Sequence, residues 1–285
     1  MMSMVKRLYP GGKPKAFNIS YDDGVLQDVR FVALLNKFRL KGTFNLNSGL
    51  MKTEFSWVHE NGMTVTRLSK DVVSALYEGH EVASHTCTHP YMENLSKAEI
   101  LGQMAADRFF LEKLLGREVK GFAVPFEYYS PLIAECAREV GFEYARISEE
   151  TNGYILPNEP YWWRGGKFHW DEDLESYVEG FLKTDEELAL CQIVGHSYDL
   201  DVLDMWDRME NVLHRVAADE NVVAMTNLEL ARYTAGMNLA QITDRKVRNE
   251  SNIALWFRVD GRIVCVQPGI YKGCIVALFV ARRNN

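Results

Sequence analysis

Residues 18–28 read NISYDDGVLQD, a strand-like run that ends on two adjacent aspartates and a glycine. Asp-Gly is a common turn pair and Asp often caps helices, so turn chemistry alone could account for Asp22 and Asp23. The following residues, 29–38, carry apolar side chains at helical spacing. The stretch therefore predicts a strand, a tight turn and a helix, with two carboxylates at the turn.

The same order of strand and helix repeats along most of the chain. Each of seven apolar, strand-like segments is followed by a helical pattern or a long connection. These segments are residues 15–20, 42–47, 80–84, 120–124, 142–148, 188–194 and 221–226. Ser96 and Glu99 form a capping box at the start of one helix, and Gly116 stands where that helix should end. Such alternation predicts a parallel sheet, which could stay open or close into a barrel.

From about residue 240 the pattern changes. Residues 252–269, NIALWFRVDGRIVCVQPG, alternate apolar side chains around Asp260-Gly261, which is a hairpin signal. We therefore expect an α/β domain over residues 1–238 and a small β extension over residues 239–285.

Composition excludes several classes of protein. The chain has 285 residues, 47% hydrophobic content and a net charge of −7, which argues against a surface that binds nucleic acid. No stretch reaches the roughly 18 to 20 apolar residues of a membrane span, and the N-terminus shows no signal peptide. The five cysteines are scattered, without a C-x-x-C pair, which favours a reducing compartment. We expect a cytoplasmic protein, although export by a route not visible here stays open.

Residues with catalytic potential follow four of the predicted strands. They are Asp22 and Asp23 after the first strand, His85 and His89 after residues 80–84, Pro125 and Phe126 after residues 120–124, and His196 after residues 188–194. In parallel α/β architectures the carboxyl ends of the strands form the active site. We therefore expect these side chains to meet.

His85 and His89 are four residues apart, so a helical turn or a compact loop brings both imidazoles to one side. Two imidazoles and one carboxylate are a common ligand set for a divalent metal ion with open coordination positions. A hydrolytic metal site also needs a second carboxylate to take a proton from water. Residue chemistry alone leaves open which of Asp22 and Asp23 is the ligand and which is the base.

The four motifs, in this order, resemble those of the polysaccharide deacetylase family (NodB-homology domain, carbohydrate esterase family 4). SYDDG at 20–24 resembles the family's T-F-D-D-G, and SHTCTHP at 84–90 matches its H-[ST]-x-x-H-P. FAVPFE at 122–127 resembles its R-x-P-[YF]-G, and IVGHSYD at 193–199 its late L-x-H. The resemblance covers roughly residues 14–235. It implies a distorted (β/α)7 TIM-like barrel that hydrolyses an acetyl group from an N-acetylated sugar or polysaccharide.

The resemblance also implies a role for each motif residue. Asp22 would be the base and His196 the general acid. Asp23, His85 and His89 would hold one divalent metal ion, with zinc expected and cobalt, nickel or manganese as alternatives.

The resemblance also implies which residues contact the substrate. The backbone N–H of Phe126, beside Pro125, would stabilise the oxyanion of the tetrahedral intermediate. Trp170, in the aromatic segment KFHWDED, is our candidate for the family's Asp-Trp motif, and its flat ring suits a sugar. The expected partner is a carbohydrate or a small N-acetylated substrate, and the oligomeric state is left open.

The chain departs from the family pattern at three places, one of which is the replacement of Thr-Phe by Ser20-Tyr21. Ala123 stands where the family has an arginine that orients the catalytic aspartate, and Arg146 and Arg164 are candidates to replace it. Glu127 stands where the family has a glycine. Two alternatives stay open: a hydrolase of a small cyclic amide or imide, which an intracellular location and the missing arginine would favour, and a non-catalytic carbohydrate-binding descendant.

Overall fold

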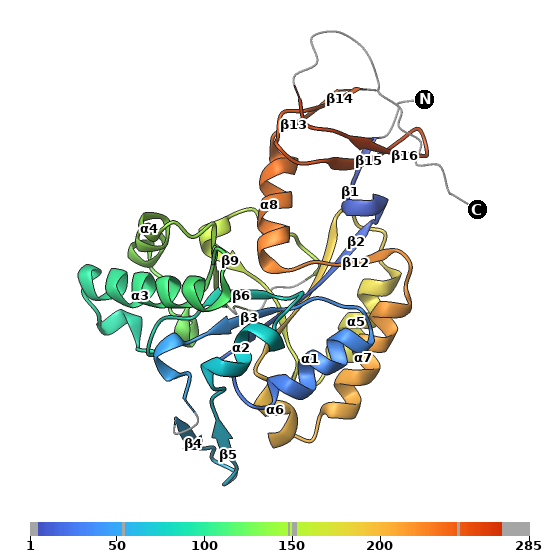
Figure 1. Cartoon of the computed structure of the whole chain (residues 1–285). Helices are drawn as coiled ribbons and strands as arrows, with labels where there is room; N and C mark the ends of the chain where they lie inside the picture. The colour runs from blue at the N-terminus through green and yellow to red at the C-terminus, as the bar shows by residue number, and fades with distance from the viewer. Residues whose placement is uncertain (1–4, 53–54, 148, 150–152, 244–245, 270–285) are drawn as a thin grey trace.

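The computed structural model describes residues 5–52, 55–147, 149, 153–243 and 246–269. Within them, a nine-stranded parallel sheet curls into a distorted barrel with helices around it (Figure 1). Its strands are β2 (Lys15–Asp22), β3 (Thr43–Leu46), β6 (Glu81–Ser84), β7 (Gly121–Ala123), β8 (Tyr144–Ile147), β9 (Trp163–Arg164), β10 (Lys167–Phe168), β11 (Ala189–Gly195) and β12 (Val222–Ala224). The helices are α1 (Asp28–Lys37), α2 (Lys70–Leu76), α3 (Lys97–Leu115), α4 (Pro131–Val140), α5 (Leu174–Lys183), α6 (Ser197–Val202), α7 (Trp206–Ala218) and α8 (Asn227–Asn238). The predicted distorted (β/α) barrel is confirmed, and each of the predicted strand segments overlaps a strand of this sheet.

The strand order fixes where the carboxyl ends meet. Along the sheet the strands run β10, β11, β2, β3, β6, β7, β8 and β9, and β12 pairs with the first half of β2. All eight residues of β2 are buried, as expected for a central parallel strand covered on both faces. It pairs with β11 from Lys15 to Tyr21 and with β3 from Ser20 to Asp22. The aspartates at its end therefore lie next to the ends of β3 and β11.

A short antiparallel hairpin, β4 (Ser56–Val58) and β5 (Thr64–Thr66), is inserted between β3 and α2. It projects from one end of the barrel (Figure 1). Its strands have three residues each, too few for an alternating pattern, and it was not predicted. The short helix α6 was not predicted either.

A smaller antiparallel sheet lies at the end of the molecule opposite the β4–β5 hairpin (Figure 1). It consists of β1 (Val5–Leu8), β15 (Leu255–Val259) and β16 (Arg262–Val266), with β13 (Ala240–Thr243) paired to β14 (Lys246–Asn249) close by. The predicted turn at Asp260-Gly261 joins β15 to β16, and its residues have φ of 47° and 78°, as a two-residue hairpin turn of type I′ requires. The division between residues 1–238 and 239–285 stays a prediction.

Two of the scattered cysteines, Cys136 and Cys191, are buried, and Cys265 is half-buried, while Cys274 lies outside the described residues. None of the helices in the described part of the chain combines the length and apolar character that crossing a membrane requires.

Candidate active site

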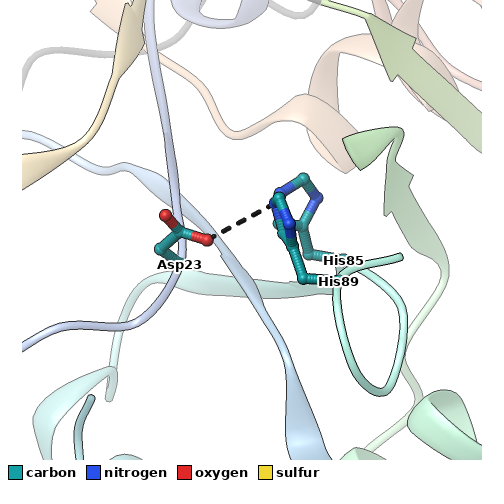
Figure 2. Close-up of side chains that lie close together, drawn as sticks. All are labelled: Asp23, His85 and His89. Atoms are coloured by element: carbon teal, nitrogen blue, oxygen red, sulfur yellow. Dashed lines mark hydrogen bonds and ion pairs between the residues drawn. The ribbon is translucent and has the colours of Figure 1, made fainter. Parts of the chain in front are cut away.

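Three potential metal ligands converge at the carboxyl ends of β2 and β6. One ligand atom from each of Asp23, His85 and His89 lies within 4.8 Å of the others. The Nε2 atoms of His85 and His89 are 3.1 Å apart, and Nε2 of His89 is 3.7 Å from Oδ1 of Asp23. Figure 2 shows the Asp23 carboxylate facing the two imidazoles. The structure thus brings together the three residues that the sequence singled out as ligands.

The chemistry of these three donors fits a divalent cation. His85 Nδ1 is 2.9 Å from the carbonyl oxygen of Ala123; donating its N–H there leaves the Nε2 lone pair for the cluster. Burial lowers the pKa of His85, and burial together with His85 lowers the pKa of His89 to about 4. Burial alone would raise the pKa of Asp23, but Arg67 and the nearby histidines hold it well below its usual range. Neutral imidazoles and an ionised carboxylate are the metal-binding forms.

Asp22 lies beside this cluster in a network of polar contacts. Arg146 Nη2 lies 2.5 Å from Oδ1 and 2.7 Å from Oδ2 of Asp22, and Asn45 Nδ2 donates to Oδ1 at 2.6 Å. Oδ2 is 4.0 Å from Nε2 of His85. Burial alone would raise the pKa of Asp22, but Arg146, His85 and His196 outweigh it and hold the pKa below its usual value. Asp22 is therefore ionised at neutral pH and can accept a proton.

The two arginines that could replace the missing family arginine differ in position. Arg146 is buried and reaches Asp22. Arg164 is half-exposed, and its guanidinium lies 3.5 Å from the carboxylate of Glu149. Arg146 therefore occupies the place next to the aspartate.

His196 follows β11 and is held by the first turn of α6. Its Nδ1 is 3.0 Å from Oδ2 of Asp199, and its Nε2 is 3.9 Å from Oδ2 of Asp23. Burial alone would lower the pKa of His196, but the hydrogen bond to Asp199 and the charge of Asp23 raise it to about 9. The imidazole is therefore protonated at neutral pH, with Nε2–H available on the side of the cluster.

Pro125, Phe126 and Glu127 form a tight turn one residue after the end of β7. Pro125 is buried, whereas the Phe126 side chain is half-exposed. Phe126 and Glu127 have φ of 54° and 59°, in the left-handed region that favours glycine. The backbone thus keeps the conformation for which the family glycine is suited, even though glutamate stands there.

Aromatic rings flank the cluster on two sides. The Phe126 ring meets His89 edge-on at 4.5 Å between centroids and stacks on Tyr91 at 3.8 Å. On the other side, the ring of Trp170 lies parallel to His196 at 6.3 Å. The predicted substrate-side residues therefore lie close to the predicted ligands and acid.

Four residues that form hydrogen bonds with residues of the candidate site were not predicted from the sequence: Asn45, Asn47, Arg67 and Asp199. For Asp199 a signal was available, because it follows His196 by three residues at a helix start, where the two side chains share one face. The other three contact the site through residues distant in the sequence, so no local pattern marks them.

Comparison with known proteins finds a family match over part of the chain. Residues 10–145 match the family described as polysaccharide deacetylase. The uncharacterized protein YlxY of Bacillus subtilis (strain 168) is 26% identical over 122 residues, which are 43% of this chain but only 33% of that protein.

Solved structures share the fold. A presumed polysaccharide deacetylase from Mycobacterium smegmatis superposes with a TM-score of 0.57 and 14% identity, covering 84% of this chain and 96% of that one. A mutant of a CE4 family pseudoenzyme with restored enzymatic activity gives a TM-score of 0.50 and 16% identity, covering 79% of this chain and 70% of that one. At these identities the structures establish the fold alone. The match to the polysaccharide deacetylase family spans residues 10–145, just under half of this chain, and the solved structures add the shared fold.

Proposed function

We propose that this protein is a metal-dependent deacetylase that removes an acetyl group from an N-acetylated sugar or polysaccharide. One observation carries the proposal: ligand atoms of Asp23, His85 and His89 converge within 4.8 Å, with the Asp22 carboxylate 4.0 Å from His85 Nε2 and His196 Nε2 3.9 Å from the Asp23 carboxylate. A pair of groups with pKa values on opposite sides of neutrality suits general base and general acid work.

Asp23, His85 and His89 would hold the metal ion. Two imidazoles and one carboxylate suit zinc, and also accept cobalt, nickel or manganese. When bound, the cation would act as a Lewis acid on the acyl oxygen of the substrate.

Asp22 and His196 would transfer protons during the reaction. The Asp22 carboxylate accepts a proton from the attacking water as the new C–O bond forms. The His196 imidazolium donates its Nε2 proton to the leaving nitrogen as the C–N bond breaks, which releases acetate and an amine. The backbone N–H of Phe126 would donate to the oxyanion that forms in between.

The surroundings favour a sugar as substrate. Tyr91 and Phe126 are exposed beside His89, and Trp170 lies on the side of His196. Flat aromatic faces suit the apolar faces of sugar rings. The missing arginine was a reason to consider cyclic amides, and Arg146 beside Asp22 removes that reason. The cytoplasmic location stays a prediction.

Acetate release tests the proposal. Zinc-loaded protein should release acetate from N-acetylglucosamine oligomers, and Asp22→Asn should abolish turnover while zinc stays bound. Asp260→Asn, in the distant hairpin turn, is the matched control and should keep full activity. Hydrolysis of a small cyclic imide, with no acetate from any acetylated sugar, would contradict the proposed substrate class.

A further inference from the structure

Arg67 and Asn47 form a polar bridge between the two loops that carry the potential metal ligands. Arg67 Nη1 donates to the backbone oxygen of Asp23, to Asp23 Oδ1 at 2.9 Å and to Asn47 Oδ1 at 2.9 Å. Asn47 Nδ2 donates in turn to the carbonyl oxygens of His85, at 2.5 Å, and Thr86, at 3.1 Å. The bridge therefore runs from the loop after β2 to the loop after β6.

The sheet order explains why Asn47 can span these loops. β3 lies between β2 and β6, and Asn47 is the first residue beyond β3. In the register, Asn45 is level with Asp22 on one side, and Leu46 is level with Ser84 on the other. One residue further along, Asn47 has a ligand-bearing loop on each side.

The β4–β5 hairpin brings Arg67 to this place from the other direction. The backbone N–H of Leu68 donates to the carbonyl oxygen of Gly24 at 2.9 Å, which fixes the segment of Arg67 alongside that of Asp23. Trp57 on β4 packs on the guanidinium, with 5.0 Å from its carbon to the ring centroid. The position of Arg67 is therefore fixed by backbone and side chain together.

The bridged loops contain residues with unfavourable backbone conformations. Asp23, Thr86 and His89 have φ of 87°, 67° and 53°, which non-glycine residues rarely adopt. Such conformations persist where surrounding contacts fix them. The bridge bonds the carbonyl oxygens of Asp23 and Thr86, and Arg67 and Asn47 are buried, so water competes little for these bonds.

We infer that Arg67 and Asn47 are positioning residues that hold Asp23 and His85 in the geometry for metal binding before the cation arrives. The positive charge of Arg67 opposes a nearby cation, but losing its hydrogen bonds to Asp23 and Asn47 should lower metal affinity by more than losing its charge would raise it. The inference rests on the proposed function only for the presence of a cation at this site.

Metal affinity measured without substrate tests the inference. Arg67→Lys keeps the charge but loses the planar guanidinium, and Asn47→Ala removes the link to the His85 loop while leaving the Arg67–Asp23 pair intact. Each variant should bind zinc and cobalt about 10- to 100-fold more weakly than the wild type, the range typical for residues that orient metal ligands. The visible absorption bands of bound cobalt should shift, because they report the ligand geometry.

Arg108→Lys is the matched control. Arg108 also pairs with a carboxylate, that of Glu112 at 2.9 Å, and donates to the backbone oxygen of Val140, away from the site. It should leave metal affinity unchanged. Circular dichroism of the metal-free proteins checks the fold. If Arg67→Lys does not fold, the metal affinity of Asn47→Ala alone tests the inference.

The outcomes separate this inference from the proposed function. If the wild type binds no metal, both fail. If the wild type binds metal and the folded variants bind it equally well, only the positioning role is wrong. Wild-type affinity in Arg67→Lys together with tighter binding in Arg67→Gln would show that Arg67 acts through its charge, which also overturns the inference.

Discussion

The guanidinium of Arg146 on β8 contacts both carboxylate oxygens of Asp22 on β2, at 2.5 and 2.7 Å. In the parallel register of β7 and β8, Arg146 is the partner of Ala123, the position where the family arginine is missing. Arg146 therefore lies one strand away from Ala123, at the same level of the barrel, and reaches the aspartate.

Replacing Arg146 with alanine should impair both stability and catalysis. It leaves the Asp22 carboxylate buried without its cationic partner, which lowers the free energy of unfolding by about 3–5 kcal/mol. The kcat for acetate release should fall by about 10- to 100-fold because the carboxylate is no longer oriented. The double variant Ala123→Arg/Arg146→Ala should recover part of both losses. Wild-type kcat in Arg146→Ala would contradict the orienting role.

The pH dependence of kcat should report on His196 and Asp199. The raised pKa of His196, about 9, keeps the acid protonated, so activity should persist to about that pH and decline above it. Asp199→Asn removes the negative partner, so the pKa of His196 falls toward its usual 6.5 and the alkaline decline moves to lower pH. Asp201→Asn, on the same helix, is the control. An unchanged alkaline decline in Asp199→Asn would exclude His196 as the titrating acid.

Glu127→Gly should stabilise the protein. Glutamate at φ 59° occupies a left-handed backbone conformation that costs a non-glycine residue about 1 kcal/mol, and glycine avoids that cost. Chemical denaturation should show a gain of this order. The neighbouring Tyr128 has φ of −74°, so Tyr128→Gly should give no such gain. Destabilisation by Glu127→Gly would show that the side chain contributes more than the backbone strain costs.

Glu81 should matter for stability away from the site. Its carboxylate accepts bonds from the Thr43 hydroxyl at 3.0 Å, the Tyr144 hydroxyl at 2.8 Å and the Leu228 N–H at 2.8 Å, and so links β3, β6, β8 and α8. Glu81→Ala leaves these donors without their acceptor and should lower the free energy of unfolding by about 3 kcal/mol. Glu143→Ala, which removes a largely exposed ion pair, should cost less than about 1 kcal/mol. Equal losses in the two variants would contradict the structural role of Glu81.

The sequence predicted the features that local patterns encode. Apolar strands followed by helical spacing indicated the barrel, and the paired motifs placed Asp22, Asp23, His85 and His89 at strand ends. The supporting residues were harder to find because their contacts are long-range. Arg146 lies 124 positions from Asp22 in the sequence.

The case of Arg67 shows the same limit. It contacts Asp23, which lies 44 positions earlier in the sequence. The strands before it, β4 and β5, have only three residues each, too few to show an alternating apolar pattern. Spacing alone could not choose between Arg146 and Arg164 as partner of the aspartate, because that choice depends on which strands are neighbours in the barrel.

Zinc binding by His89→Ala tests the proposed metal site most directly. Purified protein, stripped and dialysed against zinc, should hold about one zinc ion per chain in the wild type. His89→Ala should lose it, and His214→Ala, an exposed histidine on α7, should keep it. Equal zinc content in the wild type and His89→Ala, or no zinc in the wild type, would contradict the proposed metal site.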